Sequence, residues 1–240
     1  KRIQELMEQN VAAQKEKRKS EMKALQAQIN PHFLYNTLDS IIWMAEAGQN
    51  DDVVLMTSAL AKLLRQSISN DKEQVRVEEE INYVQSYLTI QKMRYKDKLE
   101  YEIELEDGIG REKIVKLVLQ PLVENAIFHG LEPKGGHGSV LLDISTDPAT
   151  GDVLLRLTDD GIGMPPEQVA HLLDAPAGEK EKAEKFRHVG LWNVNRRIQY
   201  SFGEAYGLTI ESEEGIGTEV TIRLPYQKKG NDHAADLTCG

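Results

Sequence analysis

The spacing of apolar residues changes near residue 98 of this 240-residue chain, and that change limits the folds it can adopt. Before it, apolar side chains recur every three or four residues, which is the period of an amphipathic helix. After it, apolar and charged residues alternate from Leu99 to Leu105, as in a strand with one buried face. The sequence therefore predicts a helical N-terminal part followed by a separate α/β domain.

The helical part is predicted to contain a helical hairpin. Residues 1–24 lack glycine and proline and predict a coiled-coil or linker helix that continues to Ala47. Pro31 has no backbone N–H, so it predicts a kink inside that helix. A turn over 48–52 then leads to a second helix over roughly 52–69.

The two helices of this hairpin present more apolar surface than a two-helix unit can bury. Pairing with a second copy into a four-helix bundle would cover it, and packing against the rest of the same chain is the alternative. We assign residues 25–97 to the histidine-containing dimerisation helices and a connecting helix. The stripe on the second helix consists of Val53, Met56, Leu60, Leu63 and Leu64.

The second domain is expected over 98–226, as an α/β sandwich with helices on one face of a mixed sheet. Residues 227–240 predict a disordered tail. The expected helices cover 77–95, 117–130 and 189–202, and the expected strands cover 99–105, 140–144, 153–157, 208–211 and 218–224.

The charge balance and the single cysteine exclude several classes of protein. The chain has 29 basic and 39 acidic residues and no long basic run outside its first helix, which argues against a nucleic-acid surface. Cys239 has no intrachain partner, so a disulfide-built scaffold is excluded and a reducing, cytoplasmic compartment is expected. No apolar run approaches the roughly 20 residues of a membrane span, and the start at Lys1 is typical of a soluble fragment.

His32 is the candidate nucleophile of the helical part. It follows Pro31 within Leu25–Leu38, whose apolar residues keep helical spacing. A single helical histidine is more often a packed or solvated residue than a catalytic one. Asn36 lies one turn further on the same helix face, close enough to hydrogen-bond a ring nitrogen.

Two segments of the second domain suit a nucleotide. Asn125 and His129 lie one helical turn apart on one face and can serve a magnesium-bound triphosphate, although such a pair is weak evidence by itself. Asp159 ends a predicted strand, where a carboxylate can accept the adenine amino group, and Gly161 and Gly163 let the backbone approach the base. The alternative for this second segment is a tight turn with solvated acids.

Two later glycine segments suit phosphate groups. Gly190 precedes a helix containing Leu191 and Asn193, and the first N–H groups of such a helix can hold phosphate oxygens. Gly215–Thr218 opens the last strand, where a plain β-turn is the alternative. The charged, poorly periodic residues 174–187 predict a lid over the nucleotide.

In this order and spacing, the four segments resemble the N, G1 and G2 boxes and the final Gly-x-Gly-Thr of the GHKL ATP-binding fold. The stretch QINPHFLYNTLDSI, followed by LQPLVENAIFHG, is similar to the YesM/LytS-like sensor histidine kinases of bacterial two-component systems. The resemblance covers roughly residues 20–225. It implies an ATP-dependent protein histidine kinase that uses ATP and Mg²⁺ and passes a phosphoryl group to the receiver domain of a response regulator.

The resemblance also implies a role for each matching residue. Carried over by position, His32 would be the phosphoacceptor, Asn125 the magnesium ligand and Asp159 the adenine-binding acid. Glu124 and His129 would flank the phosphates. The remaining nucleotide-binding positions would be Gly161, Gly163, Gly190, Leu191, Asn193, Gly217 and Thr218. Family members are usually membrane-anchored dimers, which implies a homodimer on the cytoplasmic side of the membrane, anchored by a segment outside this chain.

The sequence departs from the family pattern around the phosphates. Phe128 stands where many relatives carry a lysine, so the positive charge would come from Lys134 or Arg187. Residues 185–188 replace the glycines that often precede Gly190.

A third departure concerns proton removal. Phe33 replaces the acid that often follows the phosphoacceptor, so the base is absent or elsewhere. We rank tautomer control by Asn36 above proton removal by Glu124, because a neutral imidazole needs orientation more than deprotonation before it attacks.

Two rival functions stay open. One is a GHKL-type ATPase that remodels a partner, and the other is a degenerate kinase that binds nucleotide and only scaffolds a dimer. Acid-labile, base-stable phosphorylation would separate a kinase from both. The stimulus, the cognate regulator and the choice between cis and trans phosphorylation are not encoded in these residues.

Overall fold

The computed structural model describes residues 31–68, 74–174 and 182–226, and its contacts divide the chain into two units. The helical unit consists of residues 1–71 and 86–94, and the α/β unit of residues 72–85 and 95–240. The contact boundary therefore does not follow a single cut at residue 98. Helix α4, Val77–Tyr95, contributes residues to both units and has the bounds expected from the sequence.

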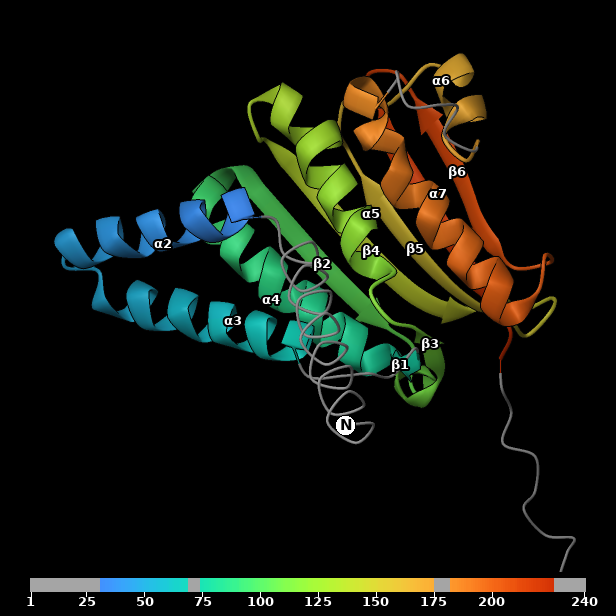
Figure 1. The fold of residues 1–240 in the computed structure, drawn as a ribbon, viewed down its shortest axis with the longest axis horizontal. Coiled ribbons are helices and arrows are strands. Elements are labelled where there is room, and N and C mark those ends of the chain that lie inside the picture. The colour runs from blue at the N-terminus through green and yellow to red at the C-terminus, as the bar shows by residue number, and fades with distance from the viewer. Residues whose placement is uncertain (1–30, 69–73, 175–181, 227–240) are drawn as a thin grey trace, which may run out of the picture. The chain divides into compact units, whose positions relative to one another are not determined.

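The described part of the helical unit contains the expected hairpin (Figure 1). Helix α2 spans Pro31–Glu46 and helix α3 spans Asn50–Ile68. Gly48 makes the turn possible with a φ of 73°, and the N–H of Gln49 donates to the carbonyl of Met44. The predicted helix over 1–24 and its continuation through the Pro31 kink lie outside the described residues.

Apolar side chains of the hairpin divide into a buried and an exposed set. Met56, Leu60 and Leu63 of the predicted stripe are buried, whereas Val53 and Leu64 are half-buried. The exposed set consists of Tyr35, Leu38, Ile42 and Trp43 on α2 with Val54 and Leu55 on α3. The surplus apolar surface predicted from the sequence is present on the helical unit.

The α/β unit is built on a five-stranded mixed sheet of order β2-β4-β5-β7-β6. Strand β2 runs parallel to β4, and the other neighbouring pairs are antiparallel. The strands are β2 Leu99–Leu105, β4 Gly138–Thr146, β5 Val153–Asp159, β6 Gly207–Glu213 and β7 Gly217–Leu224. These strands confirm the predicted mixed sheet and both predicted hairpins.

The two faces of this sheet differ in polarity, which explains why the helices gather on one of them. One face carries buried residues such as Leu142, Leu157 and Ile222. Against this face pack α5, Leu119–Asn125, and α7, Lys182–Phe202, side by side (Figure 1). The other face carries polar pairs such as Arg156 with Asp143, whose nitrogen and oxygen atoms lie 3.0 Å apart. The helices therefore cover one face, as predicted.

The helices of the α/β unit differ from the prediction in three places. Helix α5 spans Leu119–Asn125 and continues as a π-helix over Ala126–Leu131, where an ordinary helix was expected. Helix α7 spans Lys182–Phe202 and so begins inside the expected lid, whose residues 175–181 lie outside the described part. The short helix α6, Pro166–His171, was not predicted.

Two very short strands were also missed. Strand β1, Gln74–Arg76, pairs antiparallel with β3, Lys113–Val115, in a separate two-stranded sheet. Three residues are too few to show a period of two, so alternation could not have found them. The predicted disordered tail over 227–240 lies outside the described residues.

Candidate functional site

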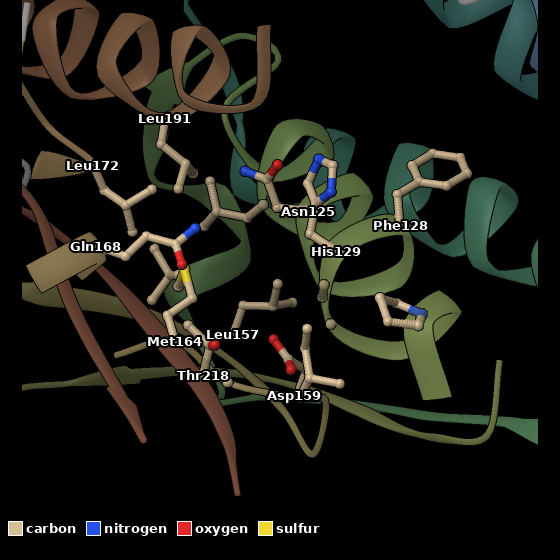
Figure 2. Close-up of a pocket in the computed structure, with 17 residues that line it drawn as sticks. Asn125, Phe128, His129, Leu157, Asp159, Met164, Gln168, Leu172, Leu191 and Thr218 are labelled. Carbon is tan, nitrogen blue, oxygen red and sulfur yellow. The ribbon is translucent and has the colours of Figure 1, made fainter. Parts of the chain in front are cut away.

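A pocket opens between the helices and the sheet of the α/β unit, with about 900 Å³ of empty space, part of it continuous with solvent. Its walls come from α5 and the π-helix, from the end of β5 and the first half of β7, and from α6 and the middle of α7 (Figure 2). The lining residues are Leu122, Asn125, Ala126, Phe128, His129, Gly130, Pro133, Leu157, Asp159, Ile162, Gly163, Met164, Gln168, Leu172, Leu191, Thr218 and Val220. An apolar wall with few polar groups is typical of a small-molecule site.

Asp159 is the buried acid of this pocket, at the last residue of β5 and only 7% exposed. Its Oδ1 atom accepts a hydrogen bond of 2.9 Å from the N–H of Gly161. Burial raises the pKa of Asp159 to about 6, and the neighbouring charge of Asp160 adds to this, while the N–H groups of Gly161 and Thr218 lower it. At neutral pH the side chain is therefore mostly an anion that accepts hydrogen bonds in an apolar wall.

Several positions around Asp159 are glycines because a side chain at these positions would overlap neighbouring atoms. A Cβ atom on Gly130 would lie 2.6 Å from Oδ1 of Asp159, and one on Gly161 would overlap the backbone of Gly130. Gly217 and Gly163 both have positive φ angles, of 151° and 62°. A Cβ on Gly217 would overlap the carbonyl oxygen of Asp159. Glycine is therefore required at Gly161, Gly163 and Gly217 by neighbouring atoms of the protein itself, and the predicted approach of this backbone to the adenine base stays a prediction.

The π-helix shapes the opposite wall. Asn125 is the last residue of α5, and His129 lies within the π-helix that follows. Figure 2 shows both side chains across the pocket from the Asp159 carboxylate. π-helical turns occur often at functional sites, because they displace side chains from the regular helical pattern. The amide and imidazole expected to face a triphosphate do share one pocket with the acid.

Glu124 does not line this pocket, although it precedes Asn125. Its side chain is half-buried, and its Oε1 accepts a 2.7 Å hydrogen bond from Gln120. Burial raises the pKa of the Glu124 carboxyl, and the Gln120 bond only partly offsets this.

Of the remaining predicted site residues, some line the pocket and others do not. Leu191 is buried and lines the pocket, and Thr218 lines it with its Oγ1 2.9 Å from the hydroxyl of Ser212. Asn193 is exposed and does not line it. Gly190 does not line it either, and among the described residues a Cβ there would touch only Pro121, at 3.8 Å.

The sequence reasoning missed the α6 wall. Met164, Gln168 and Leu172 line the pocket from this short helix and its flanks. A usable signal was present, since Pro165 and Pro166 stand where a helix begins, and proline is favoured at the first helical position.

Lys134 and Arg187 are the two residues expected to supply positive charge near the phosphates. Lys134 donates from Nζ to the carbonyl of Asp160 at 2.5 Å, which holds its ammonium beside the acid-bearing loop. The side chain of Arg187 lies outside the described part of the structure. Phe128, which stands in place of a lysine, lines the pocket.

The second candidate group lies in the helical unit. His32 is exposed on α2, with the amide nitrogen of Asn36 3.2 Å from its Nε2 and 3.4 Å from its Nδ1. The next residue, Phe33, is 5% exposed and stacks on Tyr87 of α4 with ring centroids 5.0 Å apart. Tyr87 in turn accepts a 2.7 Å hydrogen bond from Gln91. Phe33 is therefore an anchor that fixes the helix on which the imidazole is presented.

Two negative findings hold for the described residues. No helix among them is long and apolar enough to cross a membrane. No group of three or more His, Cys, Asp or Glu side chains among them could hold a metal ion.

Comparison with known proteins gives matches over most of the chain. Residues 20–99 match the histidine kinase family, and residues 110–228 match the histidine kinase-, DNA gyrase B- and HSP90-like ATPases. The sensor histidine kinase YesM of Bacillus subtilis is 43% identical over 225 residues, which cover 94% of this chain and 37% of that protein. The sensor protein LytS of the same organism is 31% identical, over 90% of this chain and 36% of that protein.

The chain thus spans little more than a third of the length of these curated relatives. Among solved structures, the histidine kinase domain of a blue-light activated histidine kinase from Erythrobacter litoralis aligns with 85% of this chain and 92% of its own, at 18% identity and a TM-score of 0.44.

Proposed function

This chain belongs to the histidine kinases, and from that premise we propose that it binds ATP in the Asp159 pocket and autophosphorylates His32. The phosphoryl group then passes to an aspartate on the receiver domain of a response regulator. The rival functions are a GHKL-type ATPase and a degenerate kinase that acts as a nucleotide-dependent dimer scaffold.

The observation that carries the proposal is the buried carboxylate of Asp159 in an apolar pocket that also contains Asn125 and His129. Adenine offers an amino donor to such an acceptor, and the apolar residues Leu157, Met164 and Leu172 can cover its faces. A solvated turn, the alternative considered for this segment, would not bury the acid to 7% exposure.

Asn125 is the residue that we propose to hold Mg²⁺ together with the phosphates. An amide oxygen is a ligand this ion accepts, and the ion would neutralise charge on the phosphoryl group during transfer. His129, on the same wall, can donate to a phosphate oxygen. Thr218 and the backbone near Gly163 complete the polar contacts at the Asp159 side.

His32 acts as the nucleophile in this proposal. A ring-nitrogen lone pair forms the bond to phosphorus, the bond between the γ-phosphorus and its bridging oxygen breaks, and ADP leaves. The proton on the other ring nitrogen then goes to a base or to solvent. Loose phosphoryl-transfer transition states need alignment more than a strong base.

Asn36 supports this role through its position beside the imidazole. If its N–H donates to one ring nitrogen, the proton of the neutral ring sits on the other nitrogen, so the amide selects a tautomer. The nitrogen that accepts this bond also carries the lone pair needed for attack, so the bond is released as phosphorus approaches. Glu124, whose pKa is raised by burial, is the proposed proton acceptor of secondary importance.

The exposed apolar residues of the hairpin support a homodimer. Ile42 and Trp43 on α2 and Val54 on α3 are each more than half exposed, which is costly in water. A second copy of this chain is the partner that we propose, as a four-helix bundle. The location on the cytoplasmic side of the membrane, through a segment outside this chain, remains a proposal that rests on the family.

The test is to incubate the chain with γ-labelled ATP and map the label. Acid-labile, base-stable label on His32 supports the kinase. Release of inorganic phosphate without protein labelling would favour the ATPase, and binding without either outcome would favour the degenerate scaffold.

A further inference from the structure

Glu80 is a buried carboxylate that the proposed mechanism does not use. It lies on α4, is 3% exposed, and is not among the residues that line the pocket. Its two oxygens accept three backbone hydrogen bonds, from Leu117 at 2.6 Å, Val118 at 3.1 Å and Leu119 at 3.3 Å. These are consecutive N–H groups that lead into α5.

The backbone at this point is unusual. Leu117 has a φ of 57°, in the left-handed region that a leucine seldom adopts. This turn directs three successive N–H groups toward one carboxylate. Such a conformation persists where surrounding contacts hold it, and Glu80 supplies those contacts on the N–H side.

A second side chain holds the same turn from its carbonyl side. Arg197 of α7 donates to the carbonyl of Lys116 at 2.6 Å and to that of Leu117 at 3.5 Å. The start of α5 is therefore fixed between an acid on α4 and a base on α7. Both side chains belong to the α/β unit.

The burial of a carboxyl group at Glu80 needs an explanation, because an apolar residue would be easier to bury. Burial raises the pKa of the Glu80 carboxyl, and the three N–H bonds and the charge of Arg197 only partly offset this. In some proteins, buried polar or ionic groups are retained for the specific arrangement they impose rather than for stability. Here that arrangement is the entry point of one helix.

We propose that Glu80 is a positioning residue for the wall of the pocket that carries Asn125. By binding the three N–H groups at Leu117–Leu119, Glu80 sets the start and the rotation of α5, and thereby the placement of the Asn125 side chain. Asn125 is the last residue of this seven-residue helix, so a shift or rotation at the start of the helix also displaces the Asn125 amide. The inference rests on the proposed function, in which Asn125 faces the phosphates and their Mg²⁺.

This role predicts that nucleotide binding will separate into two parts. Asp159 ends β5 and is held by the N–H of Gly161, independently of Glu80. Loss of the Glu80 contacts should therefore disturb phosphate and magnesium recognition while adenine recognition is kept.

The experiment compares Glu80→Gln with the parent chain by calorimetric binding of adenosine and of Mg²⁺·ATP. The amide lacks one acceptor oxygen and turns an N–H toward the backbone donors, so we expect Mg²⁺·ATP affinity to fall about tenfold or more. Adenosine affinity should stay within about twofold, and amide exchange at residues 117–119 should accelerate. The matched control is Glu79→Gln, an exposed residue of the same helix that accepts one bond from the N–H of Arg76, and it should change neither affinity.

Equal weakening of adenosine and Mg²⁺·ATP would show a merely structural role and overturn the inference, as would unchanged Mg²⁺·ATP affinity. If Glu80→Gln does not fold, Arg197→Lys loosens the same turn from its exposed side and must show the same selective loss. Failure of the parent chain to bind Mg²⁺·ATP would instead count against the proposed function.

Discussion

Replacing Asp159 by asparagine should make the nucleotide-free protein more stable while it loses adenine recognition. The folded-state pKa of about 6 exceeds the ordinary value of 3.8, and each pKa unit corresponds to about 1.36 kcal/mol. Keeping Asp159 ionised therefore costs the folded state about 3 kcal/mol. Asparagine carries no charge, and its amide oxygen can still accept the N–H of Gly161, so up to this amount is regained.

The pH dependence gives this prediction a sign. Because the folded protein holds the Asp159 proton more tightly than the unfolded chain does, the parent loses stability as the pH rises from about 4 to about 6, and the loss is complete above about pH 7. The asparagine variant lacks this change. Its advantage in free energy of unfolding should be about 3 kcal/mol at most near pH 8 and about half as large near pH 5.

The assay is urea unfolding followed by the fluorescence of Trp192, which lies on α7 of the α/β unit. The chain has two tryptophans, so the exposed Trp43 is first replaced by phenylalanine in every variant. Adenosine binding is measured in parallel and should be lost, because an amide can present a donor where an acceptor is needed.

Asp147→Asn is the control with the opposite sign. The N–H of Ala149 and the Thr150 hydroxyl lower the pKa of the Asp147 carboxyl, so its contribution is present above the ordinary pKa and disappears as the pH falls. The reasoning about Asp159 is refuted if Asp159→Asn unfolds at lower urea than the parent near pH 8, or if its advantage does not change with pH.

Three further predictions concern the proposed phosphoacceptor His32, the residues proposed to assist it, and the dimer interface. His32→Gln should bind ATP as the parent does and take up no label, and residual label on another histidine would contradict the assignment. Asn36→Leu should slow phosphorylation severalfold at unchanged ATP affinity, and a larger loss in Glu124→Gln with ATP still bound would reverse their order of importance. Ile42→Lys should raise the dimer dissociation constant about tenfold or more in sedimentation experiments, because it places a charge on the exposed apolar face, and an unchanged constant would locate the interface elsewhere.

The sequence predicted the parts of this fold whose periodicity is long enough to be read. Helix α4 and the strands β4 to β7 each span several periods, and the structure confirms them. It did not predict β1, β3 or α6, because each has only three to six residues and is defined by what it packs against.

The same limit applies to the site. Asp159 and Asn125 stand in recognisable segments, so pattern reasoning reached them, and the structure brings both into one pocket. Glu80 stands among three consecutive glutamates, Glu78–Glu80, and nothing in the local pattern marks the one that is buried. Its role depends on contacts with residues 37 to 39 positions away, which local spacing does not encode.

The crowding of glycines around Asp159 has a consequence for inhibition. A compound that displaces ATP by binding the Asp159 carboxylate would face a wall in which Gly130, Gly161 and Gly217 cannot gain a side chain without overlap. A substitution at one of these glycines that blocks the compound would also disturb Asp159, the acid that both the compound and ATP bind. Escape from the compound would have to arise at adaptable positions such as Met164, where changes in side-chain volume are tolerated more easily, so resistance should concentrate on the α6 side of the pocket.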